Sequence, residues 1–364
     1  GPYRLRNDLA RLDVRTLGRM LMTHRERELA TIRHEVPDRI PVDAICIENR
    51  EAVAAHAGIA PGEVTEYLGL DGWVVAAGYK GPIQPGCSEW GTPNTGDYGT
   101  GRSYPLAASE SVKDVERHGW PDPARYDYGG LAAAIREPAA SYALRGPYWH
   151  PLFCRVCDLM GMEESMVRMH TEPLIFEAIL EQVFQRTEEY CRRFLDACGD
   201  SAPILCLGDD FATQKGLMIS PEHWRKYLKP RFARLFAVGK QRGKSVWFHS
   251  CGDITAVLPD LIDIGVDVWE TVQLHTLPMT PQDLKRLYGR HITFFGAVST
   301  QRLPFIKPDQ VAGEVRRCIE MLGEGGGYIC GPDHHIKPDV SVENTLALFR
   351  TATEFRARGY TTLA

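Results

Sequence analysis

Short apolar runs alternate with helix-length segments along most of the chain. Each run is rich in residues that favour extended structure and is followed by Gly, Pro or polar residues, so each predicts a strand. Eight such runs are present, at residues 40–47, 73–77, 142–146, 203–208, 245–249, 266–270, 292–296 and 327–330. Between the last five runs, Pro221, Pro281 and Pro308 stand where the first turn of a helix tolerates proline. Alternating strands and helices favour a parallel sheet with helices outside it.

Eight strands in a chain of 364 residues favour a closed (β/α)₈ TIM barrel, with a doubly wound open sheet as the alternative. No fixed-period repeat or linker divides the chain. We therefore predict an N-terminal helical arm at 1–25 and a single barrel at 26–364. Residues 79–104, rich in Gly, Pro and aromatic residues, predict a hairpin-like insertion over the barrel mouth. Residues 161–199 predict a long amphipathic helical segment.

The charge balance excludes some partners. The chain has 42 basic and 47 acidic residues, a formal charge of -5 and no long basic run, so we expect no nucleic-acid partner. No stretch of 18 apolar residues predicts a membrane span, and residues 1–25 are too charged for a signal-peptide core. We expect a cytoplasmic protein whose partners are small molecules or proteins, and we leave a homodimer open. Gly1-Pro2 is interpreted as a remnant of protease cleavage.

Several predicted strands end in residues that bind metals. In His249-x-Cys251 the imidazole and the thiol are two residues apart, so an extended strand directs both to one face. Cys330 ends the last predicted strand, where inward side chains at a barrel mouth converge. One His and two Cys are the protein ligands of one kind of catalytic zinc site, which keeps a fourth position open. The alternative is that these are ordinary core residues.

Other strand-end residues are candidates for catalysis or substrate binding. Asp210 is a candidate base and Asp209 a candidate substrate ligand, whereas the alternative for both is a helix N-cap. Glu270 is a candidate catalytic residue, as a displaceable fourth metal ligand, or else an ordinary acid near a helix start. Of His334 and His335, one is expected to support the site, and we assign the substrate contact to His335.

Cys154 and Cys157 form a rival metal or redox motif of the C-x-x-C type. The motif has no second Cys or His pair at zinc-finger spacing and precedes an amphipathic segment. We therefore interpret both cysteines as mainly structural.

Four segments resemble the uroporphyrinogen decarboxylase superfamily. They are HEVPDRIPVD at 34–43, GDDFATQKGLMISPEHWRKYLKPRF at 208–232, FHSCGD at 248–253 and GGGYICGPDHHIKPDVSVENTLALF at 325–349. The resemblance extends from about residue 25 to 358 and implies a single (β/α)₈ barrel. Decarboxylases of this superfamily carry an Arg-rich motif after the first strand that grips substrate carboxylates. Here residues 46–51 (CIENRE) hold one Arg and two acids, so a substrate with eight carboxylates is badly matched.

The other branch that the chain resembles is the zinc-dependent methyltransferases that work with corrinoid proteins. His249, Cys251 and Cys330 fall on the zinc-ligand positions of that branch. The resemblance implies Zn²⁺ as cofactor and methyl transfer between a corrinoid (cobalamin) and a thiol, methoxy or related heteroatom substrate, in either direction. Methylcobalamin or cobalamin is expected on a separate corrinoid protein, because residues 333–338 (DHHIKP) have Pro where the D-x-H-x-x-G motif needs Gly.

Two other function classes stay open at this point. One is a metal-free decarboxylase of a tetrapyrrole or another organic acid, and the other is a binding protein built on a degenerate barrel. The metal content of the purified protein separates the first from a zinc methyltransferase. The sequence does not identify the methyl donor or acceptor, because loops build the walls of such pockets.

Overall fold

A computed structural model describes residues 22–94, 104–147 and 151–355. Seven parallel strands form one sheet in the order β1-β2-β3-β6-β7-β8-β9. Their bounds are β1 (Gly72–Val74), β2 (Ala143–Gly146), β3 (Ile204–Gly208), β6 (Ser245–His249), β7 (Val268–Val272), β8 (Thr293–Val298) and β9 (Tyr328–Pro332). Each overlaps a run that the sequence predicts as a strand. All carboxyl ends therefore meet at one edge of the sheet.

Residues 41–43 join the two edges of this sheet. The Cys330 N–H of β9 donates to Pro41 O at 2.9 Å, and the Asp43 N–H donates back to Cys330 O at 3.0 Å. On the other side, the N–H of Asp71, just before β1, donates to Val42 O at 2.8 Å. The predicted first strand at 40–47 is thus reduced to two isolated bridges, from Val42 to Cys330 and from Ile47 to Ile336, and Pro41 has no N–H to extend the pairing. The TIM-barrel fold is confirmed, with a short irregular eighth member.

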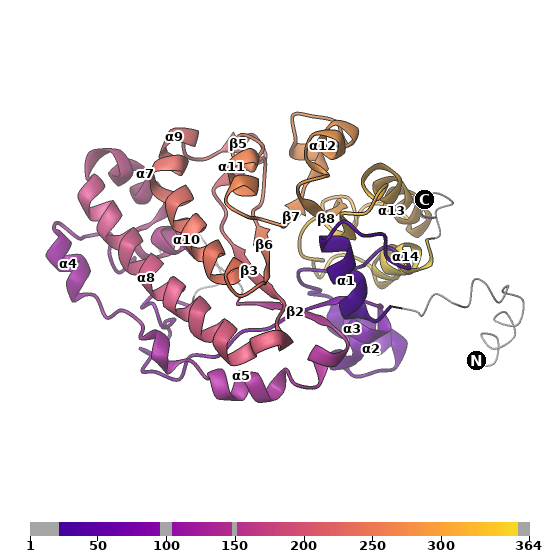
Figure 1. Ribbon diagram of the computed structural model, residues 1–364, viewed down its shortest axis with the longest axis horizontal. Helices are drawn as coiled ribbons and strands as arrows, with labels where there is room; N and C mark the ends of the chain where they lie inside the picture. Colours follow the sequence, from indigo (N-terminus) through magenta and orange to yellow (C-terminus); the bar gives the residue numbers. More distant parts are fainter. Residues whose placement is uncertain (1–21, 95–103, 148–150, 356–364) are drawn as a thin grey trace, which may run out of the picture.

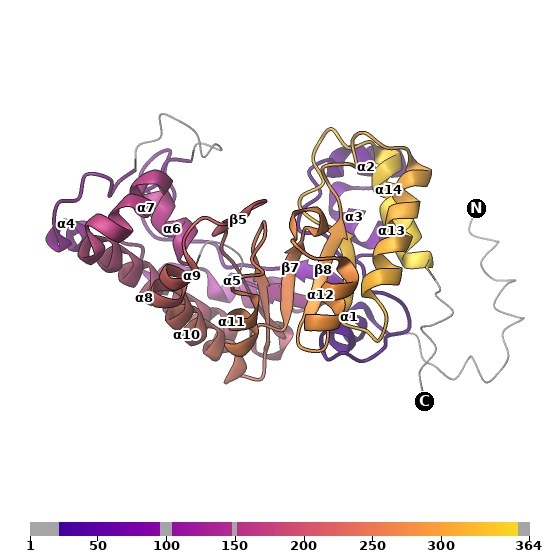
Figure 2. The same cartoon turned by 90° about the horizontal axis from the view of Figure 1, so that it is seen from above.

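Helices cover the outside of the sheet. They are α1 (His24–Ile32), α2 (Arg50–Ala57), α3 (Val64–Tyr67), α4 (Val112–Arg117), α5 (Tyr128–Ala134), α6 (Phe153–Met160), α7 (Met162–Thr171), α8 (Pro173–Cys198), α9 (Pro221–His223), α10 (Lys229–Lys240), α11 (Leu258–Asp263), α12 (Pro281–Tyr288), α13 (Pro308–Leu322) and α14 (Val342–Glu354). Helices α8 and α10 lie on one side of the strands, and α13 and α14 lie on the other (Figures 1 and 2). Pro221, Pro281 and Pro308 occupy first helical turns, as predicted. None of the helices in the described part of the chain has the length and apolar character that crossing a bilayer requires.

Alternate residues of each strand face the inside of the barrel. The apolar residues that fill the inside form one cluster of Ile32, Ala143, Ile204, Cys206, Trp247, Val268, Phe295 and Ile329. Their strand neighbours, such as Phe248, Trp269 and Phe294, pack instead in the larger layer between strands and helices. This alternation decides which strand-end side chains reach the mouth, because His249 and Glu270 share the parity of Trp247 and Val268.

Helix α1 lies under the amino-terminal end of the barrel. Ile32 joins the inner cluster, and the Thr293 hydroxyl at the start of β8 donates to Thr31 O at 3.3 Å. The capping box formed by Thr23 and Glu26 fixes where this helix begins. The predicted boundary between an arm at 1–25 and the barrel therefore falls inside α1, and residues 1–21 lie outside the described residues.

The segment between β1 and β2 packs against α8. Helices α4 and α5 contact α8. Of the predicted insertion at 79–104, the described residues hold an antiparallel bridge between Cys87 and Pro93 and a second from Tyr79 to Tyr126. Residues 95–103 lie outside the described residues.

Candidate metal centre at the barrel mouth

Three potential metal ligands converge at the carboxyl ends of β3 and β6. Nε2 of His249 lies 3.5 Å from Sγ of Cys251 and 3.6 Å from Oδ1 of Asp210. The three ligand atoms all lie within 4.8 Å of one another. Zinc bonds of about 2.0–2.3 Å at tetrahedral angles set neighbouring ligand atoms about 3.3–3.8 Å apart. The side chains as they stand therefore fit a tetrahedral ion.

Glu270 lies behind the His249 ring. Its Oε1 lies 2.8 Å from Nδ1 of His249, and its Oε2 accepts a hydrogen bond from the Trp247 indole N–H. A carboxylate on Nδ1 holds that nitrogen protonated and leaves Nε2 as the nitrogen that can bind a metal. The prediction of Glu270 as a displaceable fourth ligand does not fit this geometry, since its carboxylate contacts the far side of the imidazole.

Contacts with Cys251, Glu270 and Asp210 change the pKa of His249. Burial alone would lower its pKa, but contact with Cys251 and with the carboxylates of Glu270 and Asp210 raises the pKa well above its ordinary value. The site is therefore rich in negative charge and favours a cation at Nε2. A metal ion would compete with this proton.

Backbone contacts hold the loop after β6 in place. Asp210 Oδ1 accepts the Cys251 N–H at 2.8 Å, and Gln273 Oε1 accepts the Gly252 N–H at 2.8 Å. Gly252 has φ +80°, and a Cβ there would lie 2.5 Å from Thr213 O, so only glycine allows this close approach. Thr213 belongs to a two-stranded hairpin of β4 (Ala212–Thr213) and β5 (Gly216–Leu217), which the sequence patterns do not reveal.

Cys330 does not lie in this cluster. Its neighbour Ile329 belongs to the inner cluster, so Cys330 points outward. There it is fully buried and close to Cys318 of α13, whose pKa is raised by burial and by the charge of Cys330. The prediction of Cys330 as a ligand assumes that the strand ends at 330, whereas β9 continues to Pro332. The structure therefore brings only two of the three predicted ligands together.

His334 lies near this cluster at the mouth, outside the group of three ligand atoms. Its ring centroid lies 6.4 Å from that of His249, and both His334 and Cys251 line one cleft. Burial, together with the neighbouring His335 and His249, lowers the pKa of His334 to about 4. At neutral pH this imidazole is therefore neutral, which is the form that binds a metal. The adjacent histidines were visible in the sequence, but only the position of the strand end indicates which one reaches the site.

Asp209 has a structural position. Its two carboxylate oxygens accept the backbone N–H groups of Phe153 and Cys154, each at 2.7 Å, at the start of α6. Asp209 is fully buried there. The alternative of a helix cap fits this geometry, and the predicted role in substrate binding does not.

His335 lies at the rim of the cleft with its ring held by an acid. Its Nδ1 lies 3.0 Å from Oε1 of Glu48, which also accepts a hydrogen bond from Lys337 Nζ at 2.6 Å. The cleft has a volume of ≈ 390 Å³ and is lined by Ala212, Thr213, Gln214, Cys251, Gly252, Gln273, Thr300, Gln301, His334, His335 and Lys337. His335 therefore stays a candidate for substrate contact, from the rim of the cleft.

The rival motif lies against the site without joining it. Cys154 Sγ accepts the Asp210 N–H at 3.1 Å, while burial raises the pKa of Cys154 and Cys157. A buried thiol with a raised pKa is a poor ligand and a poor nucleophile at neutral pH. Neither belongs to the group of metal-binding atoms found among the described residues.

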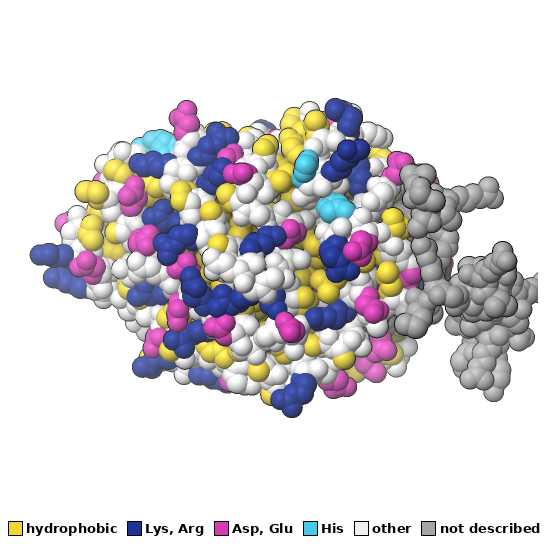
Figure 3. Space-filling model, in the orientation of Figure 1, with side chains coloured by type: hydrophobic (Ala, Val, Ile, Leu, Met, Phe, Trp, Pro, Cys, Tyr) yellow, Lys and Arg dark blue, Asp and Glu magenta, His cyan; other side chains and the backbone are white. Residues whose placement is uncertain are grey.

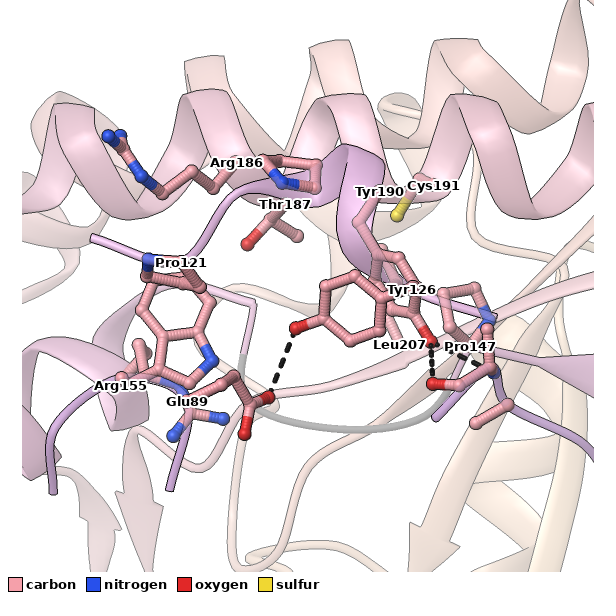
Figure 4. Close-up of a pocket in the computed structure, with 14 residues that line it drawn as sticks. Glu89, Pro121, Tyr126, Pro147, Arg155, Arg186, Thr187, Tyr190, Cys191 and Leu207 are labelled. Carbon is pink, nitrogen blue, oxygen red and sulfur yellow. Dashed lines mark hydrogen bonds between the residues drawn. The ribbon is translucent and has the colours of Figure 1, made fainter. Parts of the chain in front are cut away.

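A second cavity, of ≈ 200 Å³, lies outside the barrel wall next to α8 (Figure 4). Its polar groups largely bind one another: the Tyr126 hydroxyl donates to Glu89 Oε1 at 3.0 Å, and the Tyr190 hydroxyl donates to Ala77 O at 3.2 Å. Leu207 of β3, an outward residue, forms part of its wall. Neither His249 nor Cys251 lines this cavity, so the candidate metal ligands at the barrel mouth lie apart from it.

The family profile described as Uroporphyrinogen decarboxylase (URO-D) matches residues 152–355. This range includes Asp210, His249, Cys251 and His334 of the barrel mouth. The chain belongs to the uroporphyrinogen decarboxylase family. This confirms the resemblance seen in the sequence.

Relatives within the family include both branches. The chain is 23% identical over 200 residues to the methylcobamide:CoM methyltransferase MtaA of Methanosarcina barkeri, covering 55% of each protein. It is also 23% identical over 256 residues to a uroporphyrinogen decarboxylase of Methylococcus capsulatus, covering 66% of this chain and 69% of that protein. The match thus spans about half the length of the methyltransferase.

A solved structure shares the fold. A methyltransferase from Methanosarcina mazei superposes with a TM-score of 0.67 at 19% identity, covering 92% of this chain and 100% of the other. This likeness supports the barrel architecture over nearly the whole chain.

Proposed function

We propose that the protein is a zinc-dependent methyltransferase that moves a methyl group between a corrinoid and a small thiol, methoxy or related heteroatom substrate. The observation that carries this proposal is the spacing of His249 Nε2, Cys251 Sγ and Asp210 Oδ1, at 3.5 and 3.6 Å, which suits one tetrahedral ion. Similarity to a methylcobamide:CoM methyltransferase supports the reaction class.

Four side chains of the mouth would hold the ion. His249 and Cys251 supply a nitrogen and a sulfur, Asp210 supplies an oxygen, and His334, which lines the same cleft as Cys251, offers a further nitrogen. This set replaces the predicted His249, Cys251 and Cys330. It contains one thiolate and one carboxylate, so it neutralises a divalent cation as two thiolates would. Either Asp210 or His334 can yield its place to a substrate atom, because the Asp210 side chain is 34% exposed and His334 lines the cleft.

Zinc bound here would make a substrate thiol easier to deprotonate, or an ether or thioether a better methyl donor. The chain's own residues orient the substrate. Gln273 and Thr300 offer polar groups on the cleft wall, while Lys337 and His335 stand at the rim. Glu270 keeps His249 turned so that Nε2 faces the cleft.

The corrinoid would be carried by a separate protein that docks at the mouth. Residues 333–338 lie on the wall of the zinc cleft and in the turn that follows β9, and therefore do not offer a corrinoid-binding histidine. On the face shown in Figure 3, basic and acidic side chains are interspersed, so no extended area of a single charge marks that face for nucleic acid.

A second candidate is a metal-free decarboxylase of an organic acid, favoured by the similarity to the Methylococcus protein. Against it, the segment after the first predicted strand offers no free cluster of arginines: Glu48 pairs with Lys337 and His335, and Arg50 donates to Pro61 O. Glu48 would repel a substrate carboxylate at this position.

The test is a methyl-transfer assay on the purified protein with free methylcobalamin and a small thiol such as 2-mercaptoethanol. We expect about one zinc per chain and a zinc-dependent loss of the methylcobalamin absorbance. His249→Ala and Cys251→Ala should lose both, whereas Cys87→Ala, at a half-buried cysteine in the insertion, should lose neither. Absence of zinc with release of CO₂ from an added organic acid would replace this proposal by the decarboxylase.

A further inference from the structure

A group of buried charged side chains lies inside the barrel beneath the candidate metal centre. Arg145 of β2, Asp43 and Glu28 of α1 are each at most 1% exposed, and Glu270 of β7 is fully buried. Arg145 NH1 lies 2.5 Å from Asp43 Oδ2 and 3.7 Å from Glu28 Oε1. Arg145 faces inward, because Ala143, two residues earlier in the strand, belongs to the inner cluster. Well-packed apolar residues would avoid the desolvation cost of such charges.

These charges are linked to the candidate metal centre by one aromatic side chain. The Arg145 guanidinium lies over the Trp247 indole, with Cζ 4.4 Å from the ring centroid. The indole N–H donates to Glu270 Oε2, and Glu270 Oε1 lies 2.8 Å from His249 Nδ1. The four side chains therefore form a continuous series of contacts from β2 across the barrel to the mouth.

The sequence makes room for this series at Gly72 in β1. A Cβ at that position would lie 2.1 Å from Arg145 NH1 and 2.2 Å from Asp43 Oδ2. Any other residue would displace the ion pair from its place beside Trp247. The absence of a side chain at Gly72 thus leaves the space that Arg145 and Asp43 occupy inside the barrel.

We propose that Arg145 is a positioning residue for His249. The guanidinium holds the Trp247 indole by a cation–π contact, the indole N–H holds one oxygen of Glu270, and the other oxygen sets the ring orientation and tautomer of His249. A positive charge over the indole face also draws electron density from its N–H and strengthens the hydrogen bond to Glu270. This inference rests on the proposed function, because it concerns how His249 is prepared to bind zinc.

Two variants test the series, one at the indole and one at the guanidinium. Trp247→Phe keeps an aromatic face beside Arg145 but removes the indole N–H, together with part of the ring volume. The double variant Asp43→Asn/Arg145→Met removes both members of the ion pair together. The matched control is Trp269→Phe, which changes an equally buried tryptophan of the adjacent strand that points outward, away from the inner cluster. Its indole nitrogen has no hydrogen-bond partner to lose.

The readouts are the zinc dissociation constant, measured by competition with a chelator, and the melting temperature of the metal-free protein. We expect Trp247→Phe to weaken zinc binding about tenfold to a hundredfold and the double variant to weaken it about tenfold. The zinc dissociation constant of Trp269→Phe should stay within about twofold of the wild-type value, even if its melting temperature falls as much as that of Trp247→Phe. Wild-type zinc affinity in both test variants would overturn the inference.

A structural readout separates this inference from the proposed function. Crystal structures of the metal-free wild type and of Trp247→Phe give the distance from His249 Nε2 to Cys251 Sγ. The inference requires that the imidazole moves or rotates in the variant but not in Trp269→Phe. If the wild type binds no zinc, the proposed function fails, and an unmoved His249 ring in Trp247→Phe would then reject the positioning role as well.

Discussion

Oε1 of Glu270 lies 2.8 Å from Nδ1 of His249, on the side of the ring that faces away from Cys251. The carboxylate thus prepares the imidazole for metal binding and does not compete for the metal. Such carboxylate–histidine pairs fix the tautomer of a ligand and raise its basicity. The role of Glu270 in the proposed reaction therefore passes through His249.

Glu270→Gln should weaken zinc binding by about tenfold to a hundredfold. Both oxygens of Glu270 accept N–H groups, from Trp247 and His249, and the amide of glutamine presents an N–H to one of these donors. Chelator competition measures the change. A variant that holds zinc as tightly as the wild type but binds substrate differently would instead support the fourth-ligand role that the sequence suggests.

His334→Ala should affect zinc binding, whereas Cys330→Ala should affect only the stability of the fold. We expect His334→Ala to lower zinc affinity, because its neutral imidazole lines the same cleft as Cys251. Cys330→Ala should keep stoichiometric zinc and lose about 1 kcal/mol of unfolding free energy, since it removes a fully buried sulfur beside α13. Metal analysis and urea unfolding of the two variants check this pair. Loss of zinc in Cys330→Ala alone would return that cysteine to the site.

Much of the barrel could be predicted because parallel strands buried on both faces appear as apolar runs. The eight runs reproduce the seven strands and the bridge at Val42 to within a few residues. The hairpin of β4 and β5 could not be predicted, since its two-residue strands have no periodicity. The reduction of the first predicted strand to bridges at Val42 and Ile47 likewise follows from Pro41 and from contacts distant in sequence.

The candidate site was predicted where spacing alone determines geometry. His249 and Cys251 lie two residues apart at a strand end, and the structure brings their ligand atoms together. For Cys330 the same reasoning depends on which residues of β9 face the inside of the barrel, and a shift of one residue along the strand reverses the side on which each residue lies. The roles of Asp209 and Glu270 depended on partners from α6 and β6, which no local pattern in the sequence reveals.

Asp209→Ala should destabilise the protein by about 2 kcal/mol, because it leaves two buried N–H groups at the start of α6 without their acceptor. Asp122→Ala is the control, since Asp122 accepts a single N–H, from Ala124, in an exposed turn. We expect that variant to lose about 0.5 kcal/mol. Urea unfolding followed by circular dichroism measures both. Wild-type stability of Asp209→Ala together with lost turnover would restore a substrate-binding role for Asp209.

Asp71 joins two elements to β1: helix α1 and residues 41–43, the segment that closes the barrel (the closing segment). Its contribution to stability should depend on pH. Its carboxylate contacts Nδ1 of His24 at 2.8 Å, Arg27 NH1 at 2.7 Å and Arg39 NH1 at 2.8 Å. It also accepts the N–H of Val42 at 2.8 Å. Burial alone would raise the pKa of Asp71, but His24, Arg39 and Arg27 together lower it below its ordinary value.

The direction of this pH dependence follows from the lowered pKa of Asp71. A carboxyl group with a lower pKa in the folded state than in the unfolded state stabilises the fold above the unfolded pKa, and that stabilisation is lost as the pH falls through the folded pKa. Asp71→Asn should therefore cost about 3–5 kcal/mol at pH 7, because it leaves two arginines poorly compensated. The difference from the wild type should begin to shrink below about pH 4, where Asp71 takes up its proton in the unfolded chain but not yet in the folded one.

Urea unfolding of the wild type and of Asp71→Asn between pH 7 and pH 3 measures this dependence. Asp260→Asn is the matched control, because Asp260 also has a lowered pKa but pairs with the more exposed Arg225 and Lys229. Surface ion pairs contribute about 0–1 kcal/mol, so Asp260→Asn should change little at any pH. An Asp71→Asn variant no less stable than Asp260→Asn, or a difference that grows as the pH falls, would show that the closing segment is held by its backbone bonds alone.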